Sequence, residues 1–208
     1  MTLAEGIAVL GLELPAGAEG KLLAYLALLA KWNKVYNLTA IRDPGEMVTH
    51  HLLDSLAVLP VLARAAQDSA LAGRPYRLAD IGSGAGLPGL VLAIARPDWS
   101  ITSVESVEKK AAFQQQARIE LNLTNVSIYS GRVEDMAGDF DGVLARAFAS
   151  LSDFVCLAGH LSRRLWAMKG AYPADEVAAL PAGWKMVACH DLDVPGLQAA
   201  RCLLELER

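Results

Sequence analysis

Three glycines at alternate positions, Gly82, Gly84 and Gly86, follow closely on an acidic residue, Asp80. The stretch before them is short, apolar and typical of a strand, and Pro88 just after them suits the first turn of a helix. Glycines at such a turn allow positive φ and let a ligand approach the backbone closely, which a side chain would block. The order strand, glycine-rich turn, helix therefore predicts a site for a nucleoside-containing cofactor.

Two classes of cofactor fit this run. The segment from Gly84 to Gly89 matches the GxGxxG pattern of dinucleotide sites, although that match alone is weak. The wider frame Asp80-x-Gly82-x-Gly84-x-Gly86 resembles motif I of class I S-adenosylmethionine-dependent methyltransferases. An acidic residue at the strand end suits an ammonium and a sulfonium group better than a pyrophosphate. Glu105 ends the next strand candidate and could accept hydrogen bonds from ribose hydroxyls of either cofactor.

Further charged residues follow later strand candidates. The run 132–135 comes after the third strand and is, taken alone, typical of a solvated helix start. Arg146 ends the fourth strand, where a buried arginine needs a partner. We expect it to pair with Asp80 or Glu134, to contact a cofactor carboxylate, or to face a substrate phosphate. His50 and His51 are adjacent on a helix and so point in different directions, which favours a structural or surface role for each.

Alternating short β-rich runs and helical segments must position these residues. Such alternation predicts an α/β fold with a parallel sheet, helices on both faces and an antiparallel hairpin at one edge. The expected strands are 77–81, 100–104, 126–129, 142–145, 164–168, 185–190 and 202–207. The expected helices are 88–96, 109–121 and 150–161. A stretch around Gln67, Asp68 and Ser69 connects this region to the preceding one.

Residues 1–65 show helical spacing throughout and predict an N-terminal helical extension, with residues 66–208 forming the sheet domain. Asp43 can cap a helix that Pro44 opens, and Pro60 is expected near the end of that helix. Trp32 and Tyr36 lie on the apolar stripe of an earlier helix, which favours a core role over base stacking.

Composition limits the possible partners. The chain has 208 residues, 53% of them hydrophobic, and a formal charge of −4. This balance excludes disorder, and any nucleic-acid surface must be a local patch. Three cysteines without CxxC spacing indicate buried reduced thiols, and the absence of a basic leader or a long apolar run predicts a cytoplasmic protein. Clusters with metal-ligand spacing are also missing, so we expect no metal.

Several ordered motifs resemble the glucose-inhibited division protein B family, also called ribosomal RNA small subunit methyltransferase G. In chain order the motifs are Trp32-Asn33-Lys34-Val35-Tyr36-Asn37-Leu38-Thr39, Arg42-Asp43-Pro44, His51-Leu52-Leu53-Asp54-Ser55, the glycine run from Asp80 to Gly89, Glu105-Ser106 with Lys109-Lys110 and Phe113, Arg132-Val133-Glu134, Arg146-Ala147-Phe148-Ala149-Ser150-Leu151, and Lys169-Gly170. The resemblance covers nearly the whole chain.

The resemblance implies a Rossmann-like methyltransferase that uses S-adenosylmethionine to methylate guanine N7 in the decoding-region loop of 16S rRNA. It implies that Gly82 and Leu87 line the methionine end of the cofactor, that Val133 and Glu134 hold the adenine, and that Arg146 closes the site. Guanine N7 carries a free lone pair, so no general base is expected. The expected partner is 16S rRNA or the 30S subunit, bound by a monomer. Candidate RNA contacts are Lys109, Lys110, Arg146 and Lys169. Arg163 and Arg164 lie near the same predicted strand as Lys169, and we expect these cations to concentrate near the carboxyl ends of the strands.

Overall fold

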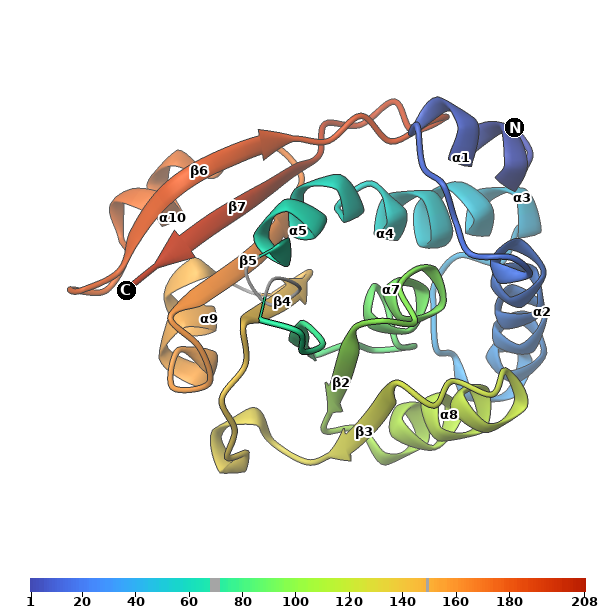
Figure 1. The fold of residues 1–208 in the computed structure, drawn as a ribbon, viewed down its shortest axis with the longest axis horizontal. Helices are drawn as coiled ribbons and strands as arrows, with labels where there is room; N and C mark the ends of the chain where they lie inside the picture. Colours follow the sequence, from blue (N-terminus) through green and yellow to red (C-terminus); the bar gives the residue numbers. More distant parts are fainter. Residues whose placement is uncertain (68–71, 149) are drawn as a thin grey trace.

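A seven-stranded sheet forms the centre of the computed structural model, which describes residues 1–67, 72–148 and 150–208. The strand order is β3-β2-β1-β4-β5-β7-β6 (Figure 1). Strands β1 to β5 are parallel, and β7 runs antiparallel to both of its neighbours, β5 and β6. The strands are β1 (Arg77–Ile81), β2 (Ser100–Glu105), β3 (Val126–Ser130), β4 (Gly142–Arg146), β5 (Arg164–Lys169), β6 (Lys185–Asp191) and β7 (Cys202–Glu207).

All seven expected strands are confirmed, with ends that differ by one residue or none. The central strands are buried on both faces, so their sequences are continuous apolar runs, whereas β6 alternates half-buried and exposed residues because it lies at the edge. The strand order reverses between β1 and β4. In open α/β sheets, ligands bind beside the carboxyl ends of strands at such a reversal.

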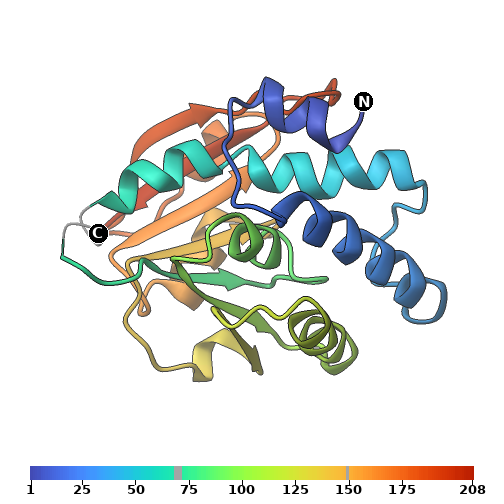
Figure 2. The same cartoon turned by 45° about the vertical axis from the view of Figure 1, so that its right-hand side comes forward.

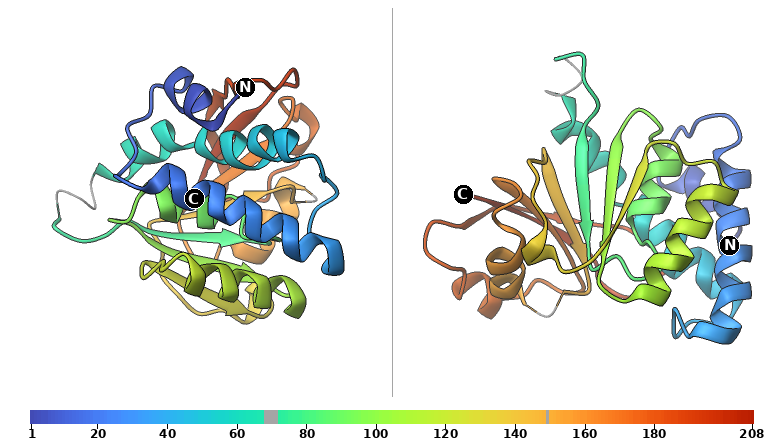
Figure 3. Two further views of the ribbon diagram at one scale, coloured as in Figure 1. Left: turned by 90° about the vertical axis from the view of Figure 1, so that its right-hand side faces the viewer. Right: turned by 90° about the horizontal axis from the view of Figure 1, so that it is seen from below.

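Helices cover both faces of the sheet (Figure 3). One face carries α7 (Gly89–Ala95) and α8 (Glu108–Glu120), and the other carries α9 (Leu151–Ala158) and α10 (Ala174–Ala178). A short 3-10 turn, η2 (Val133–Asp135), follows β3. The three helices expected in this region are confirmed, since α7, α8 and α9 match them within three residues at each end. Of the quoted motif 146–151, Ala149 lies outside the described residues, as do Asp68 and Ser69 of the expected connection.

The N-terminal region is helical, as expected. Its elements are α1 (Leu3–Val9), α2 (Ala18–Tyr36), α3 (Pro44–Met47), the π-helix η1 (Val48–Leu53), α4 (Asp54–Leu56) and α5 (Leu59–Ala65). Helix α2 lies beside α7 and α8 (Figure 2), where Leu22, Tyr25 and Leu29 are fully buried in the core of that sheet face. The division between residues 65 and 66 stays a prediction.

Three sequence expectations were wrong in this region and at the cysteines. Asp43 does cap α3, accepting a hydrogen bond from the amide of Glu46, but Pro60 opens α5 instead of ending the preceding helix, because proline suits a first turn. Tyr36 is 41% exposed, since it is the last residue of α2. Of the cysteines only Cys202 is buried; the other two lie on an exposed helix face and on the edge strand.

None of the helices within the described ranges is both long and apolar enough to cross a membrane.

Candidate active site

The glycine-rich loop leaves β1 at the strand reversal, and its glycines serve two different purposes. Gly84 and Gly86 both have positive φ, +61° and +86°. A Cβ atom on Gly84 would meet no heavy atom within 4 Å, so this residue presents bare backbone to open space. On Gly86 the same atom would lie 2.5 Å from Cδ1 of Leu90, so that glycine is needed for packing. Gly84 is therefore where a ligand can approach the main chain.

The side chains of Asp80 and Glu105, both predicted to be site residues, hold this loop through hydrogen bonds from backbone amides. Asp80 is fully buried, and its Oδ2 accepts a hydrogen bond of 2.7 Å from the amide of Gly89. Burial raises the pKa of Asp80 to about 7, against the opposing effect of that amide. Glu105 accepts from the amides of Gly84 and Val107, each at 2.8 Å. Both acids thus fix the loop in this structure.

Two further side chains that hold the loop were missed by the sequence reasoning. The hydroxyl of Tyr25 on α2 donates to the carbonyl of Ala85 at 2.8 Å. The amide of Gln114 on α8 donates to Ser83 Oγ and to the carbonyl of Gly84, each at 2.8 Å. Both side chains are fully buried. Their positions in apolar helical stripes gave no sign of this role, which depends on how α2 and α8 pack against the loop.

Two cavities flank the loop and meet at Gly82. One, of about 160 Å³, lies over the loop and is lined by Leu38, Thr39, His51, Gly82, Ser83, Gly84, Ala85, Leu87, Arg146 and Ala147. The other, of about 250 Å³, reaches η2 and is lined by Ile81, Gly82, Val104, Ser106, Gly131, Arg132, Val133, Glu134, Phe148 and Leu157. The structure therefore brings Gly82, Leu87, Val133, Glu134 and Arg146 to one edge of the sheet, as their sequence positions predict. The Glu134 carboxylate is paired with Arg132 at 2.7 Å, which lowers its pKa.

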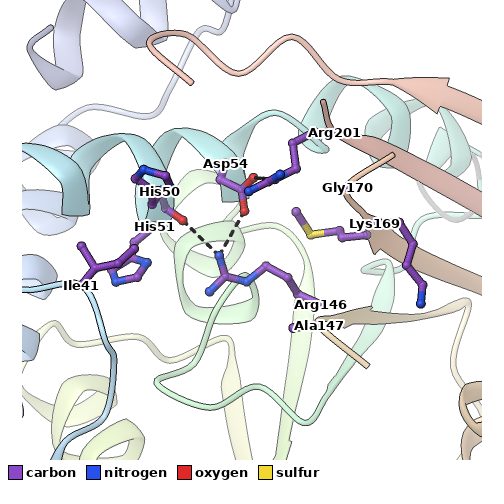
Figure 4. Close-up of a pocket in the computed structure, with 10 residues that line it drawn as sticks. Ile41, His50, His51, Asp54, Arg146, Ala147, Lys169, Gly170 and Arg201 are labelled. Atoms are coloured by element: carbon purple, nitrogen blue, oxygen red, sulfur yellow. Dashed lines mark hydrogen bonds and ion pairs between the residues drawn. The ribbon is translucent and has the colours of Figure 1, made fainter. Parts of the chain in front are cut away.

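A third cavity, of about 420 Å³, lies between η1 and the ends of β4 and β5 (Figure 4). It shares His51, Arg146 and Ala147 with the cavity over the loop. Its remaining lining residues are Ile41, His50, Asp54, Met168, Lys169, Gly170 and Arg201. The two cavities thus lie on either side of Arg146.

Arg146 pairs with Asp54, so the expected pairing with Asp80 or Glu134 was wrong. Its Nη1 donates to Asp54 Oδ2 at 3.0 Å and to the carbonyl of His50 at 3.1 Å. The other carboxylate oxygen, Oδ1, accepts from Nε of Arg201 at 3.0 Å. Asp54 therefore bridges two arginines that are 92 and 147 positions away from it in the chain. Sequence spacing could not show this bridge, because it joins three separate segments.

His51 lies at the boundary of the two cavities and is only 4% exposed. Its Nε2 is 3.1 Å from the hydroxyl of Thr39, and its Nδ1 is buried with no partner among the described residues. Burial, helped by the positive charge of Arg146, lowers the pKa of His51 to about 4. The imidazole is therefore neutral at pH 7.

This lowered pKa makes folding depend on pH. Between pH 6.5 and 4 the unfolded chain protonates His51 while the folded chain does not, so acid favours unfolding. Relative to a His51→Asn variant, the unmodified protein should lose about 2–3 kcal/mol of unfolding free energy over this range. Denaturant titrations at each pH measure it. The comparison with the variant is needed because the raised pKa of Asp80 gives a slope of opposite sign. An identical pH profile for both proteins would contradict the assignment.

The candidate RNA-binding cations divide between two edges of the sheet. Lys109 is exposed and Lys110 half-buried at the start of α8, close to the carboxyl end of β2. Lys169 lines the 420 Å³ cavity, but its ammonium is bound to Glu176 at 2.7 Å and points away from the arginines (Figure 4). Arg163 and Arg164 lie at the amino end of β5, so their expected place beside the carboxyl ends was wrong.

Comparison with known proteins gives the family. A family model described as rRNA small subunit methyltransferase G matches residues 18–204. Curated relatives named ribosomal RNA small subunit methyltransferase G include one from Azoarcus sp. (strain BH72), 57% identical over 99% of this chain and 95% of the relative. Another, from Aromatoleum aromaticum, is 53% identical over 100% of this chain and 98% of its own length. The chain belongs to the rRNA small subunit methyltransferase G family.

Solved structures with lower identity share the fold of this family member. Magnesium protoporphyrin IX methyltransferase from Synechocystis PCC 6803, solved with bound SAM, is 15% identical with a TM-score of 0.59, covering 88% of this chain and 97% of that one. TrmN from Thermus thermophilus is 21% identical with a TM-score of 0.53, over 77% and 53% of the two chains. The Rossmann-like sheet expected of a class I methyltransferase is thus confirmed.

Proposed function

We propose that this protein transfers a methyl group from S-adenosylmethionine to N7 of a guanine in the decoding-region loop of 16S rRNA. The observation that carries the proposal is the bare backbone at Gly84, in a loop that buried side chains hold and two cavities flank, in a member of this family. Family membership supports an rRNA substrate and a methyl donor. The position of the guanine comes from the sequence resemblance.

The lining residues fit this cofactor in two parts. Gly82 and Leu87 line the smaller cavity and would hold the methionine end, while Val133 and Glu134 line the larger one and would hold the adenine. Glu105 lines neither cavity but holds the amide of Gly84, and each of its carboxylate oxygens keeps a lone pair that can accept a hydrogen bond from a ribose hydroxyl. Bound S-adenosylmethionine would supply an electrophilic methyl group on its sulfonium sulfur.

The protein's contribution is to orient the reactants and exclude water. Guanine N7 presents a lone pair, so no proton has to leave before attack, and no residue needs to act as a general base. The neutral His51 is consistent with this, because it carries no charge that would repel the sulfonium. Alignment of two reactants in a closed site can lower a barrier by about 7–11 kcal/mol.

Undermodified 30S subunits, prepared from cells that lack this protein, test the proposal. Incubation with methyl-labelled S-adenosylmethionine should place label on a guanine of the decoding-region loop, identified as N7-methylguanosine by mass spectrometry of 16S rRNA fragments. Label absent from 16S rRNA, or present on another atom, would overturn it. Calorimetric titration separates the dinucleotide alternative, since tight NADH binding without S-adenosylmethionine binding would exclude a methyltransferase.

Loss of the Gln114 side chain is expected to weaken cofactor binding. Gln114→Leu keeps the volume but removes the two hydrogen bonds that hold Ser83 and Gly84. We expect the Kd for S-adenosylmethionine to rise roughly tenfold, since each such bond contributes about 1 kcal/mol. Isothermal titration measures it. Gln115→Leu, on the exposed face of the same helix, is the control, and equal Kd values for the two variants would remove Gln114 from the site.

We further propose that the protein acts as a cytoplasmic monomer on 16S rRNA or the 30S subunit, without a metal, and that residues 1–65 form a helical extension of a methyltransferase domain spanning 66–208. The packing of α2 against α7 and α8 supports a helper role for this extension in holding the loop. Light scattering during size-exclusion chromatography tests the monomer, and a dimer mass would contradict it.

A further inference from the structure

The 420 Å³ cavity presents unused guanidinium donors to its interior (Figure 4). In Arg146 only Nη1 has a protein partner among the described residues, which leaves Nη2 and Nε free. In Arg201 the hydrogen bonds to described residues use Nε and Nη1, which leaves Nη2 free among them. Both side chains are about one-quarter exposed. Free guanidinium donors that converge on a cavity are the usual recognition group for phosphate and carboxylate oxygens.

The charge of the cavity wall is positive. Asp54 supplies one negative charge against two arginines, the Lys169 ammonium is neutralised by Glu176, and His51 is neutral at pH 7. The wall therefore carries a net charge of about +1, focused where the free donors lie. An anion gains more from such a site than from exposed lysines, because less of the field is screened by water.

Two anions could use these donors, the carboxylate of S-adenosylmethionine and a phosphodiester of the RNA. Arg146 lines both this cavity and the one over the glycine loop, so it can reach either anion. Of these two cavities, Arg201 lines the 420 Å³ one and not the one that contains Gly84, and it enters from the residue just before β7. The placement of Arg201 favours the RNA.

We propose, on the basis of the function proposed above, that Arg146 and Arg201 bind a phosphodiester of the RNA strand that carries the target guanine, and that Asp54 is the positioning residue for both arginines. Each oxygen of Asp54 accepts from one guanidinium at 3.0 Å, which fixes the separation and direction of the two forks. The Asp54 side chain is 5% exposed, so it does not itself meet the RNA.

Arg201→Gln tests the phosphate contact. Binding of undermodified 16S rRNA, measured by filter binding, should weaken about tenfold, and the slope of log K against log salt should fall by roughly one. The Kd for S-adenosylmethionine, measured by calorimetry without RNA, should not change. Arg163→Gln is the matched control, because Arg163 is exposed at the opposite edge of the sheet.

Each other outcome overturns the inference. A raised Kd for S-adenosylmethionine with normal RNA binding would assign the cavity to the cofactor carboxylate, and no change in either would leave Arg201 a structural partner of Asp54. Because both measurements are of binding, they stand apart from the proposed function, which fails only if the unmodified protein does not methylate guanine N7.

The Asp54→Asn variant distinguishes two effects of Asp54, namely the positioning of the two arginines and the negative charge that it adds to the cavity wall. The substitution makes the cavity more positive, so RNA affinity would rise if Asp54 merely reduced the charge of the wall. If Asp54 positions the arginines, RNA affinity should fall about fivefold to tenfold despite the gain in positive charge, and an unchanged or higher affinity would overturn that role. Thermal unfolding of the variant accompanies the measurement, to show that the protein remains folded.

Discussion

Gly84→Val is expected to abolish binding of S-adenosylmethionine, with a Kd raised at least about a hundredfold. A valine Cβ at this position would project into space that no protein atom within 4 Å occupies, and its two methyl groups would fill part of the 160 Å³ cavity over the loop. A cofactor that lies against the bare backbone would then lose both its room and its contacts. Isothermal titration measures the loss, and methylation should disappear with it.

Backbone strain is the competing explanation, and a matched variant isolates it. Gly84 has a φ of +61°, so any β-branched residue there is strained by about 1–3 kcal/mol. Gly183 has a φ of +87° and equally open surroundings, but lies in the turn before β6, remote from the glycine loop. Gly183→Val should lower the melting temperature without changing the Kd. If Gly84→Val still binds S-adenosylmethionine, the cofactor does not approach this face of the loop.

Arg146→Ala is expected to reduce kcat by about a hundredfold or more. Among the described strand residues, Arg146 alone lines both the cavity over the loop and the 420 Å³ cavity. Its side chain therefore lies between the proposed places of the methyl donor and the RNA acceptor. Removing it merges the two spaces and admits water, and a misplacement of about 1 Å between reacting groups can cost two orders of magnitude in rate. Single-turnover methylation of 30S subunits measures the effect.

Among the described residues, the same substitution leaves Asp54 with Arg201 as its one arginine partner, which can destabilise the fold. Arg146→Lys retains the charge but not the forked donor, and should recover stability without full activity. Arg164→Ala removes an ion pair with Glu205 and Glu207 at the other edge of the sheet and controls for stability alone. Unchanged kinetics in Arg146→Ala would show that Arg146 serves only in a structural ion pair with Asp54.

Patterns among residues close together in the sequence were sufficient to predict the strands of the sheet. The strands were found because buried parallel strands are short apolar runs between turn residues, and the glycine run marks which strand comes first. The same patterns placed the candidate cofactor residues at one edge, since the carboxyl ends of parallel strands meet there. Each of these inferences needs only neighbours in sequence and the general rules of α/β topology.

Contacts between distant segments were beyond such patterns. Asp54 meets Arg146 and Arg201 only after η1, β4 and β7 come together, and Tyr25 reaches Ala85 only after α2 packs on α7. The π-helix at residues 48–53 was missed for a related reason. Its extra residue per turn is stabilised by the folded surroundings, including Arg146, which binds the carbonyl of His50.

The position of β7 has a consequence for biosynthesis. This strand follows all the others in chain order, yet it lies between β5 and β6, and Arg201 immediately precedes it. While the chain is being made, β5 has an open edge and Asp54 lacks one of its two arginines. A nascent chain that ends before residue 201 therefore has no complete pair of guanidinium forks. On the proposal that both arginines bind the RNA, the nascent protein cannot bind rRNA through both guanidinium groups until residue 201 and β7 have emerged and folded.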